Sequence, residues 1–248
     1  MLGRRELTSE DVRRLVFESI NLITEAQREL ELPLCPNIRA TSERLREGRF
    51  KAVPLPRRRG GVYQMAYGSF EPPATITLDR GIPFCDRPLD IPDIPNTMAH
   101  YTASHEVIHA DDHVGGDAIF TATREHIISD HMDKLVKGME IIENEGGCEL
   151  IGCLEDLACF WAIQYVDMVT NYRAYVALRH HNFPRLNMIW ENMDKGFFPP
   201  NMLTQIEGER GIKYVFDVVV GGAGEYCLID ALMESKSISE RNACRYTV

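Results

Sequence analysis

The chain has 248 residues, of which 44% are hydrophobic and 26% are charged, and its formal net charge is −10. This composition is typical of a globular protein with a substantial core and excludes an intrinsically disordered chain. The acidic balance argues against general nucleic-acid binding, because phosphate recognition depends on clustered Lys and Arg.

The N-terminal sequence and the cysteines bear on the cellular compartment. No apolar segment follows the arginines of MLGRRELTSED, so we expect no signal peptide. No stretch approaches the roughly 18 apolar residues of a transmembrane helix, so we expect no membrane contact. The seven cysteines include no C-x-x-C pair. We therefore expect a cytoplasmic protein with reduced thiols.

The first third of the chain predicts two helices followed by a small sheet. Residues 8–30 have the apolar spacing of an amphipathic helix that Thr8 or Ser9 can cap, and a short helix is predicted over residues 42–47. The runs FKAVPL, VYQMAYGSF and ATITL are β-rich and predict a small antiparallel sheet. The proline-rich segment that follows predicts an ordered loop.

The middle of the chain is predicted to be helical. Apolar spacing, capping residues and terminating glycines indicate helices over residues 96–115, 121–142 and 148–180. The third of these carries the most apolar stretch of the protein. The fold class expected from these elements is α+β, with a small mixed or antiparallel sheet.

An H-E-x-x-H sequence, His105, Glu106 and His109, falls in the predicted helix 96–115. Residues four apart lie on one helix face, so both imidazoles can bind one metal ion at about 2.0–2.1 Å. Glu106 lies about 100° around the helix, where a general base can approach a metal-bound water without being a ligand. The neighbouring residues are uncharged, which favours a buried site over two histidines on a solvated surface. We therefore predict a bound zinc ion.

His113 continues the four-residue spacing but is not predicted to be the third ligand. A straight helix rises about 1.5 Å per residue, which displaces His113 by about 12 Å from His105. We expect it to be an outer residue of the site or a cation at the helix C-terminus.

The third ligand is predicted to come from the helix 148–180. We expect Glu155 to lie in an apolar stripe of that helix, where a carboxylate needs a cation or another strong partner. Its alternative role is a buried salt bridge to an arginine. Glu149 is the reserve candidate, and Asp117, Glu143 and Glu145, in or near loops, rank below it.

A second group of acids and histidines occurs in the predicted helix 121–142. It comprises Glu125, His126, Asp130, His131 and Asp133. His126 and Asp130 are four apart and can pair on one face. The group is either a second metal site, an outer carboxylate–histidine pair, or a solvated helix face.

The segment ATITL, a loop, and then YTASHEVIHADDH resemble the edge strand and active-site helix of the zincin metallopeptidases. LEDLACFWA resembles, more loosely, the later helix of small gluzincins of the ImmA/IrrE and antirestriction-associated types. The resemblance implies that His105, His109 and Glu155 bind zinc and that Glu106 is the base. The chain departs from the pattern at Asp111, where a hydrophobic residue is usual, and it lacks a recognisable helix-turn-helix.

The predicted organisation is a zincin-like catalytic domain over residues 1–183 and a C-terminal extension of unknown role over 184–248. Within the domain, residues 1–48 form the N-terminal helices, 49–95 the sheet and loop, and 96–183 the helical half of the active site. The predicted activity is zinc-dependent hydrolysis of a peptide or amide bond in a peptide or protein substrate.

Three alternatives to a peptidase stay open. One is a metal-dependent hydrolase acting on other substrates, and another is a non-catalytic regulatory protein that keeps the site. A third places iron or manganese in the site, with ligands from the predicted helix 121–142. Candidate oxyanion donors are Tyr172, Arg173, His180 and His181.

Overall fold

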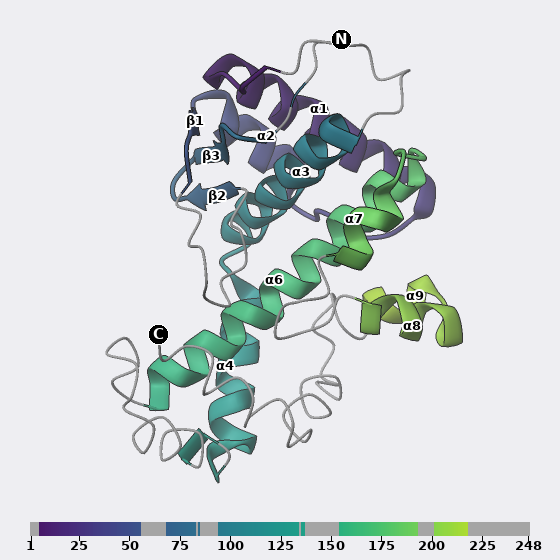
Figure 1. Ribbon diagram of the computed structural model, residues 1–248. Coiled ribbons are helices and arrows are strands. Elements are labelled where there is room, and N and C mark those ends of the chain that lie inside the picture. The colour runs from purple at the N-terminus through teal and green to yellow at the C-terminus, as the bar shows by residue number, and fades with distance from the viewer. Residues whose placement is uncertain are drawn as a thin grey trace. The chain divides into compact units, whose positions relative to one another are not determined.

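The computed structural model describes residues 5–55, 68–82, 84, 94–133, 135–136, 154–192 and 201–217 (Figure 1). These described residues fall into two compact units, one within residues 1–57, 65–117 and 170–193 and the other within residues 118–169 and 194–248. The elements are α1 Ser9–Leu30, α2 Ile38–Arg46, β1 Arg49–Val53, β2 Gly68–Glu71, β3 Thr75–Asp79, α3 Ile94–Val114, α4 Ala118–Asp130, α6 Leu154–His180, α7 Leu186–Asn192, α8 Asn201–Arg210 and α9 Ile212–Val215. The fold is α+β and mostly helical, as predicted. The proposed division after residue 183 stays a prediction.

Helix α1 begins where the sequence predicts. Thr8 caps it: the Thr8 hydroxyl accepts from the backbone N–H of Asp11, and the Asp11 carboxylate accepts from the backbone N–H of Thr8. This reciprocal capping box satisfies two amide groups that would otherwise lack partners. The buried face includes Val12, Leu15 and Ile20. Helix α2 begins four residues earlier than predicted, directly after Asn37.

The three-stranded sheet has the order β1-β3-β2 and is mixed rather than antiparallel. β2 and β3 form an antiparallel pair, whereas β1 pairs with β3 in parallel. The sequence left a mixed or an antiparallel sheet open, and the mixed arrangement is the one present. A parallel pair needs a long connection, and the chain between Val53 and Thr75, which includes β2, provides it. β3, predicted as an edge strand, lies in the centre, and its residues from Ile76 to Asp79 are buried.

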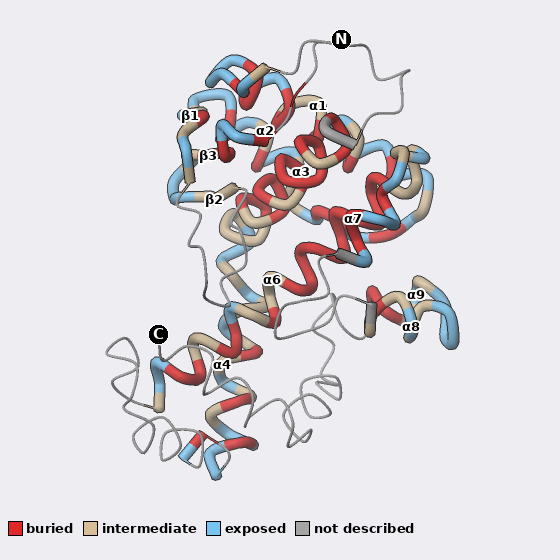
Figure 2. Tube along the Cα trace, viewed as in Figure 1, coloured by how far each residue is buried: buried red, intermediate tan, exposed pale blue. Residues whose placement is uncertain are grey.

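Helix α3 is the central element of the first unit. It contacts α1, α2, α7, β2 and β3, and Figure 2 shows buried residues along most of its length. It begins at Ile94 and ends before Gly115 and Gly116, where Gly116 has a φ of 80° that favours glycine. The prediction that the H-E-x-x-H helix is buried on both sides is confirmed by Ala103, Val107 and Ile108, which have no solvent exposure.

The second unit contains α4, the first part of α6, α8 and α9. α4 begins three residues earlier than the helix predicted over 121–142, and residues 137–153 lie outside the described part of the chain. α6 is continuous from Leu154 to His180, so it belongs to the second unit up to Val169 and to the first from Thr170. Within the described ranges, no helix is both long and apolar enough to cross a membrane.

We predict that His100, in the first unit, makes the free energy of unfolding sensitive to acid. Burial lowers the pKa of His100 from 6.5 to about 4, and the Arg14 charge adds to the shift. Its Nε2 lies 3.6 Å from the Glu18 carboxylate, and its ring contacts Phe183. The unfolded chain binds the proton more tightly, so stability should fall as the pH drops from 6.5 towards 4, and no further below that. This shift in the pKa of His100 corresponds to a loss of at most about 3 kcal/mol in the free energy of unfolding.

The measurement is urea unfolding of the wild type and His100→Gln at pH 7, 5.5 and 4. The pKa of Glu18 is raised by burial, which has the opposite effect on stability, so the difference between the two proteins isolates His100. We expect the wild type to lose more stability than His100→Gln over this window. Equal losses would contradict the assignment.

Candidate metal centre

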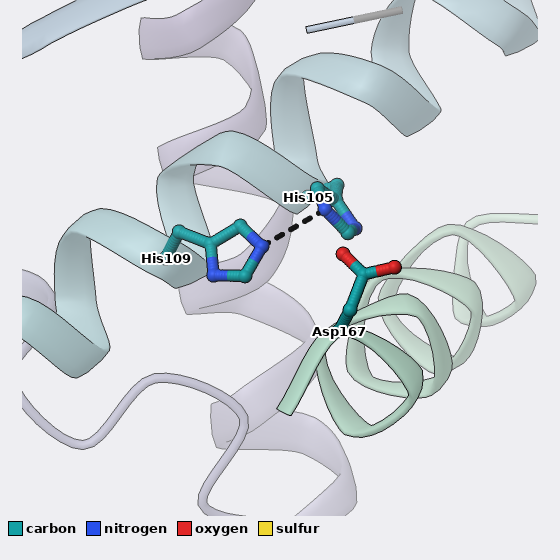
Figure 3. Close-up of side chains that lie close together, drawn as sticks. All are labelled: His105, His109 and Asp167. Carbon is teal, nitrogen blue, oxygen red and sulfur yellow. Dashed lines mark hydrogen bonds between the residues drawn. The ribbon is translucent and has the colours of Figure 1, made fainter. Parts of the chain in front are cut away.

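His105 and His109 face one another across one turn of α3 (Figure 3). Their Nε2 atoms are 3.0 Å apart and their ring planes meet at 80°. Two imidazole nitrogens that bind one tetrahedral ion at about 2.05 Å are about 3.3 Å apart. The observed separation is close to this value, so the predicted pairing of the two histidines on one face is confirmed.

The third member of the group is Asp167 of α6. One ligand atom from each of His105, His109 and Asp167 lies within 4.8 Å of the other two. Figure 3 shows the carboxylate beside the His105 ring. All three side chains are half-buried, so the group is accessible from solvent. Two imidazoles and a carboxylate on two helices therefore form a group that can hold a metal ion.

Buried ionic contacts next to His109 hold the C-terminal end of α3. The Arg173 guanidinium donates to both carboxylate oxygens of Asp112, at 2.7 and 2.9 Å, and to the carbonyl oxygen of Leu34 at 2.6 Å. Burial disfavours the charge of Arg173, but Asp112, Cys35 and Asp111 together outweigh that effect, so the pKa of Arg173 is raised. This contact joins α3 to the part of α6 that follows Asp167.

Asp111 explains one departure from the zincin pattern. Its carboxylate is fully buried and accepts from the Thr41 hydroxyl at 2.9 Å and from the Asn37 backbone N–H at 3.3 Å. Burial raises the pKa of the Asp111 carboxyl, and these donors partly offset the shift. A hydrophobic residue here would leave the start of α2 without its acceptor, so Asp111 joins α2 to α3.

Glu106 is buried and lies outside the three-residue group. A Cβ atom placed on Gly68 would come within 2.6 Å of Glu106 Oε1 and 2.9 Å of Thr102 Cγ2. The carboxylate thus occupies the space that a side chain would fill at the first residue of β2. β2, which begins at Gly68, therefore borders this part of α3.

The donors suit a divalent cation. Two neutral imidazoles and one carboxylate give the group a charge of about −1, and Glu106 lies on the adjacent face of the same helix. Nitrogen and oxygen donors without a thiolate are used by zinc hydrolases and also by non-haem iron sites. The residues therefore fit a transition metal and do not choose between zinc and iron.

Glu155, the predicted third ligand, is not part of the group formed by His105, His109 and Asp167. Its side chain is 74% exposed in the first turn of α6, and one of its oxygens is 3.8 Å from Arg124. The expectation that it lies on an apolar, buried face was wrong. A carboxylate in the first turn is stabilised by the helix dipole and needs no cation. The alternative pairing with an arginine is present, although exposed rather than buried.

The other residues considered as metal ligands either lie outside the three-residue group or lie outside the described residues. His113 lies outside the group: its Nδ1 is 3.1 Å from Asp117, and its ring is next to Phe70. His126 and Asp130 pair at 3.0 Å, as predicted, but within the described residues they form no three-ligand group. Glu143, Glu145 and Glu149 lie outside the described residues.

The proposed oxyanion donors all have other partners. Arg173 binds Asp112 and Leu34, and Tyr172 is fully buried against Trp190. His180 contacts the Glu29 carboxylate, and His181 contacts the Leu22 carbonyl oxygen.

Asp167 carried a signal that sequence reasoning did not use. It is the only acidic residue between Leu157 and His180, in the most apolar helix of the chain. A lone carboxylate in such a helix needs a partner. The prediction favoured Glu155 instead because its neighbours on one side of the predicted helix are apolar.

Comparisons with protein-family models, with curated proteins and with solved structures found no match to this chain. The zincin resemblance therefore stays a prediction carried by the motif.

Asp167→Asn tests the assignment, with Glu155→Gln as a control on the same helix. Loss of a residue that only hydrogen-bonds to a metal ligand typically weakens metal affinity by roughly 10–100-fold. Because Asp167→Asn removes the charge of a ligand itself, it should weaken zinc affinity by more than this. Glu155→Gln should leave the affinity unchanged, because its side chain is exposed. Competition with a chromophoric chelator measures both. Weaker binding in Glu155→Gln with normal binding in Asp167→Asn would reverse the assignment.

Proposed function

We propose that this protein is a zinc-dependent hydrolase that cleaves a peptide or amide bond. The observation that carries the proposal is the convergence of His105, His109 and Asp167 next to an acid, Glu106, that lies outside the ligand group. The histidines would bind the ion through Nε2, and Asp167 would bind it through a carboxylate oxygen. Such an ion lowers the pKa of a bound water towards about 7 and polarises a carbonyl.

The base in this proposal is Glu106. Glu106 lies on the adjacent face of α3, and its burial and its contact with Gly68 restrict where the carboxylate can point. A carboxylate oxygen there would accept the proton of the attacking water and later deliver it to the leaving amine. A peptide is the preferred substrate because the H-E-x-x-H spacing resembles that of zincin peptidases.

Glu106→Gln should keep the metal and lose the activity. The amide has the same shape but cannot accept the proton, so kcat should fall by about 10²–10⁴-fold. The assay uses zinc-loaded protein with quenched fluorescent peptide libraries, and with ester and small-amide substrates in parallel. Elemental analysis should find about one zinc per chain in both proteins. Full activity in Glu106→Gln would end the hydrolase proposal, and iron in the purified protein would argue against zinc.

Gly68→Ala tests whether the space at Gly68 fixes the position of the Glu106 carboxylate. The new Cβ would displace the Glu106 carboxylate, so activity should fall while zinc affinity is unchanged. Gly208→Ala is the control, because a Cβ there meets nothing within 4 Å. Wild-type activity in Gly68→Ala would show that the position of Glu106 does not depend on this glycine.

A further inference from the structure

The Tyr101 side chain links α3 to α6 one helical turn from the metal centre. Its hydroxyl donates to Asn171 Oδ1 at 2.9 Å and to the Asn171 carbonyl oxygen at 3.1 Å. Tyr101 is 2% exposed and Asn171 7% exposed, so little water competes for this bond. Within its helix, Tyr101 lies four residues before His105, and Asn171 lies four residues after Asp167.

This spacing couples the hydrogen bond to the metal ligands. Residues four apart lie one above the other on a helix, about 6 Å along its axis. Asp has a single methylene group between backbone and carboxylate, so the position of its oxygens follows the position of its helix closely. A bond that holds Asn171 against α3 therefore also restricts the Asp167 carboxylate.

Metal ligands tolerate little displacement. Ligand distances in good sites lie within about 0.2 Å of their ideal values, and supporting residues must hold the ligands to within about 0.5 Å. The histidines lie on one continuous helix and need no help to stay together. Asp167 comes from a different helix, so its approach to them depends on contacts between α3 and α6.

We propose that Tyr101 is a positioning residue of the metal centre, which acts through Asn171 to hold Asp167 within reach of the ion bound by His105 and His109. The inference rests on the metal site of the proposed function. The Asp112–Arg173 pair also joins the two helices, but its removal leaves a buried charge unpaired, which typically costs about 3–5 kcal/mol and risks unfolding. Tyr101 offers a milder change.

The test compares Tyr101→Phe with Tyr175→Phe. Each substitution removes one hydroxyl and keeps the ring. Tyr175 is also buried on α6, and its hydroxyl donates to Asn187 Oδ1 at 2.9 Å, a contact with α7 rather than with α3. We expect similar losses of thermal stability in both variants. Zinc affinity, measured by chelator competition, should weaken about tenfold in Tyr101→Phe only, and the Co²⁺ absorption spectrum should change with it.

A double-mutant cycle decides whether the effect passes through Asp167. In an Asp167→Ala background, Tyr101→Phe should change zinc affinity no further, because the ligand it positions is absent. The same tenfold weakening in both backgrounds would overturn the inference, as would equal affinities in Tyr101→Phe and Tyr175→Phe. These failures are separate from that of the metal site itself: if His105→Ala bound zinc as tightly as the wild type, the proposed function and this inference would both fall.

Discussion

The candidate site depends on one constraint: two imidazoles on α3 must meet a carboxylate that comes from another helix. His105 and His109 are brought together by the pitch of a single helix, at no cost beyond forming it. Asp167 reaches them only because α6 is held in place. The precision of the centre is thus decided by what fixes α6, and not by the motif that first draws attention to it.

The contacts that fix α6 are polar. Asn171 accepts from a phenol, and Arg173 binds a carboxylate and a backbone carbonyl. These groups are buried, so each needs its partner, and a displacement of the helix that broke these bonds would leave several of them unsatisfied at once. Directional contacts of this kind specify one arrangement of the two helices, whereas apolar packing alone tolerates several.

The same reasoning applies to the charged residues after His109. Asp111 and Asp112 interrupt a buried helix and look unfavourable in the sequence. In the structure each has its own partners: Asp111 has donors from α2 and the residue before it, and Asp112 has Arg173. The pair thereby joins α2, α3 and α6 around the end of α3. Substitution of either would act on the site through the position of these helices.

The sequence by itself determined the local features: the capped helix α1, the buried helix with H-E-x-x-H, and the facing pair His105 and His109. These follow from spacing along one chain segment, because helix pitch alone decides which side chains share a face. Only the tertiary structure decided that Asp167 joins them, that Glu155 stays exposed, and that β2 borders Glu106. The physical reason is that a helix places several acids at different angles, and which of them meets another helix depends on how the two cross.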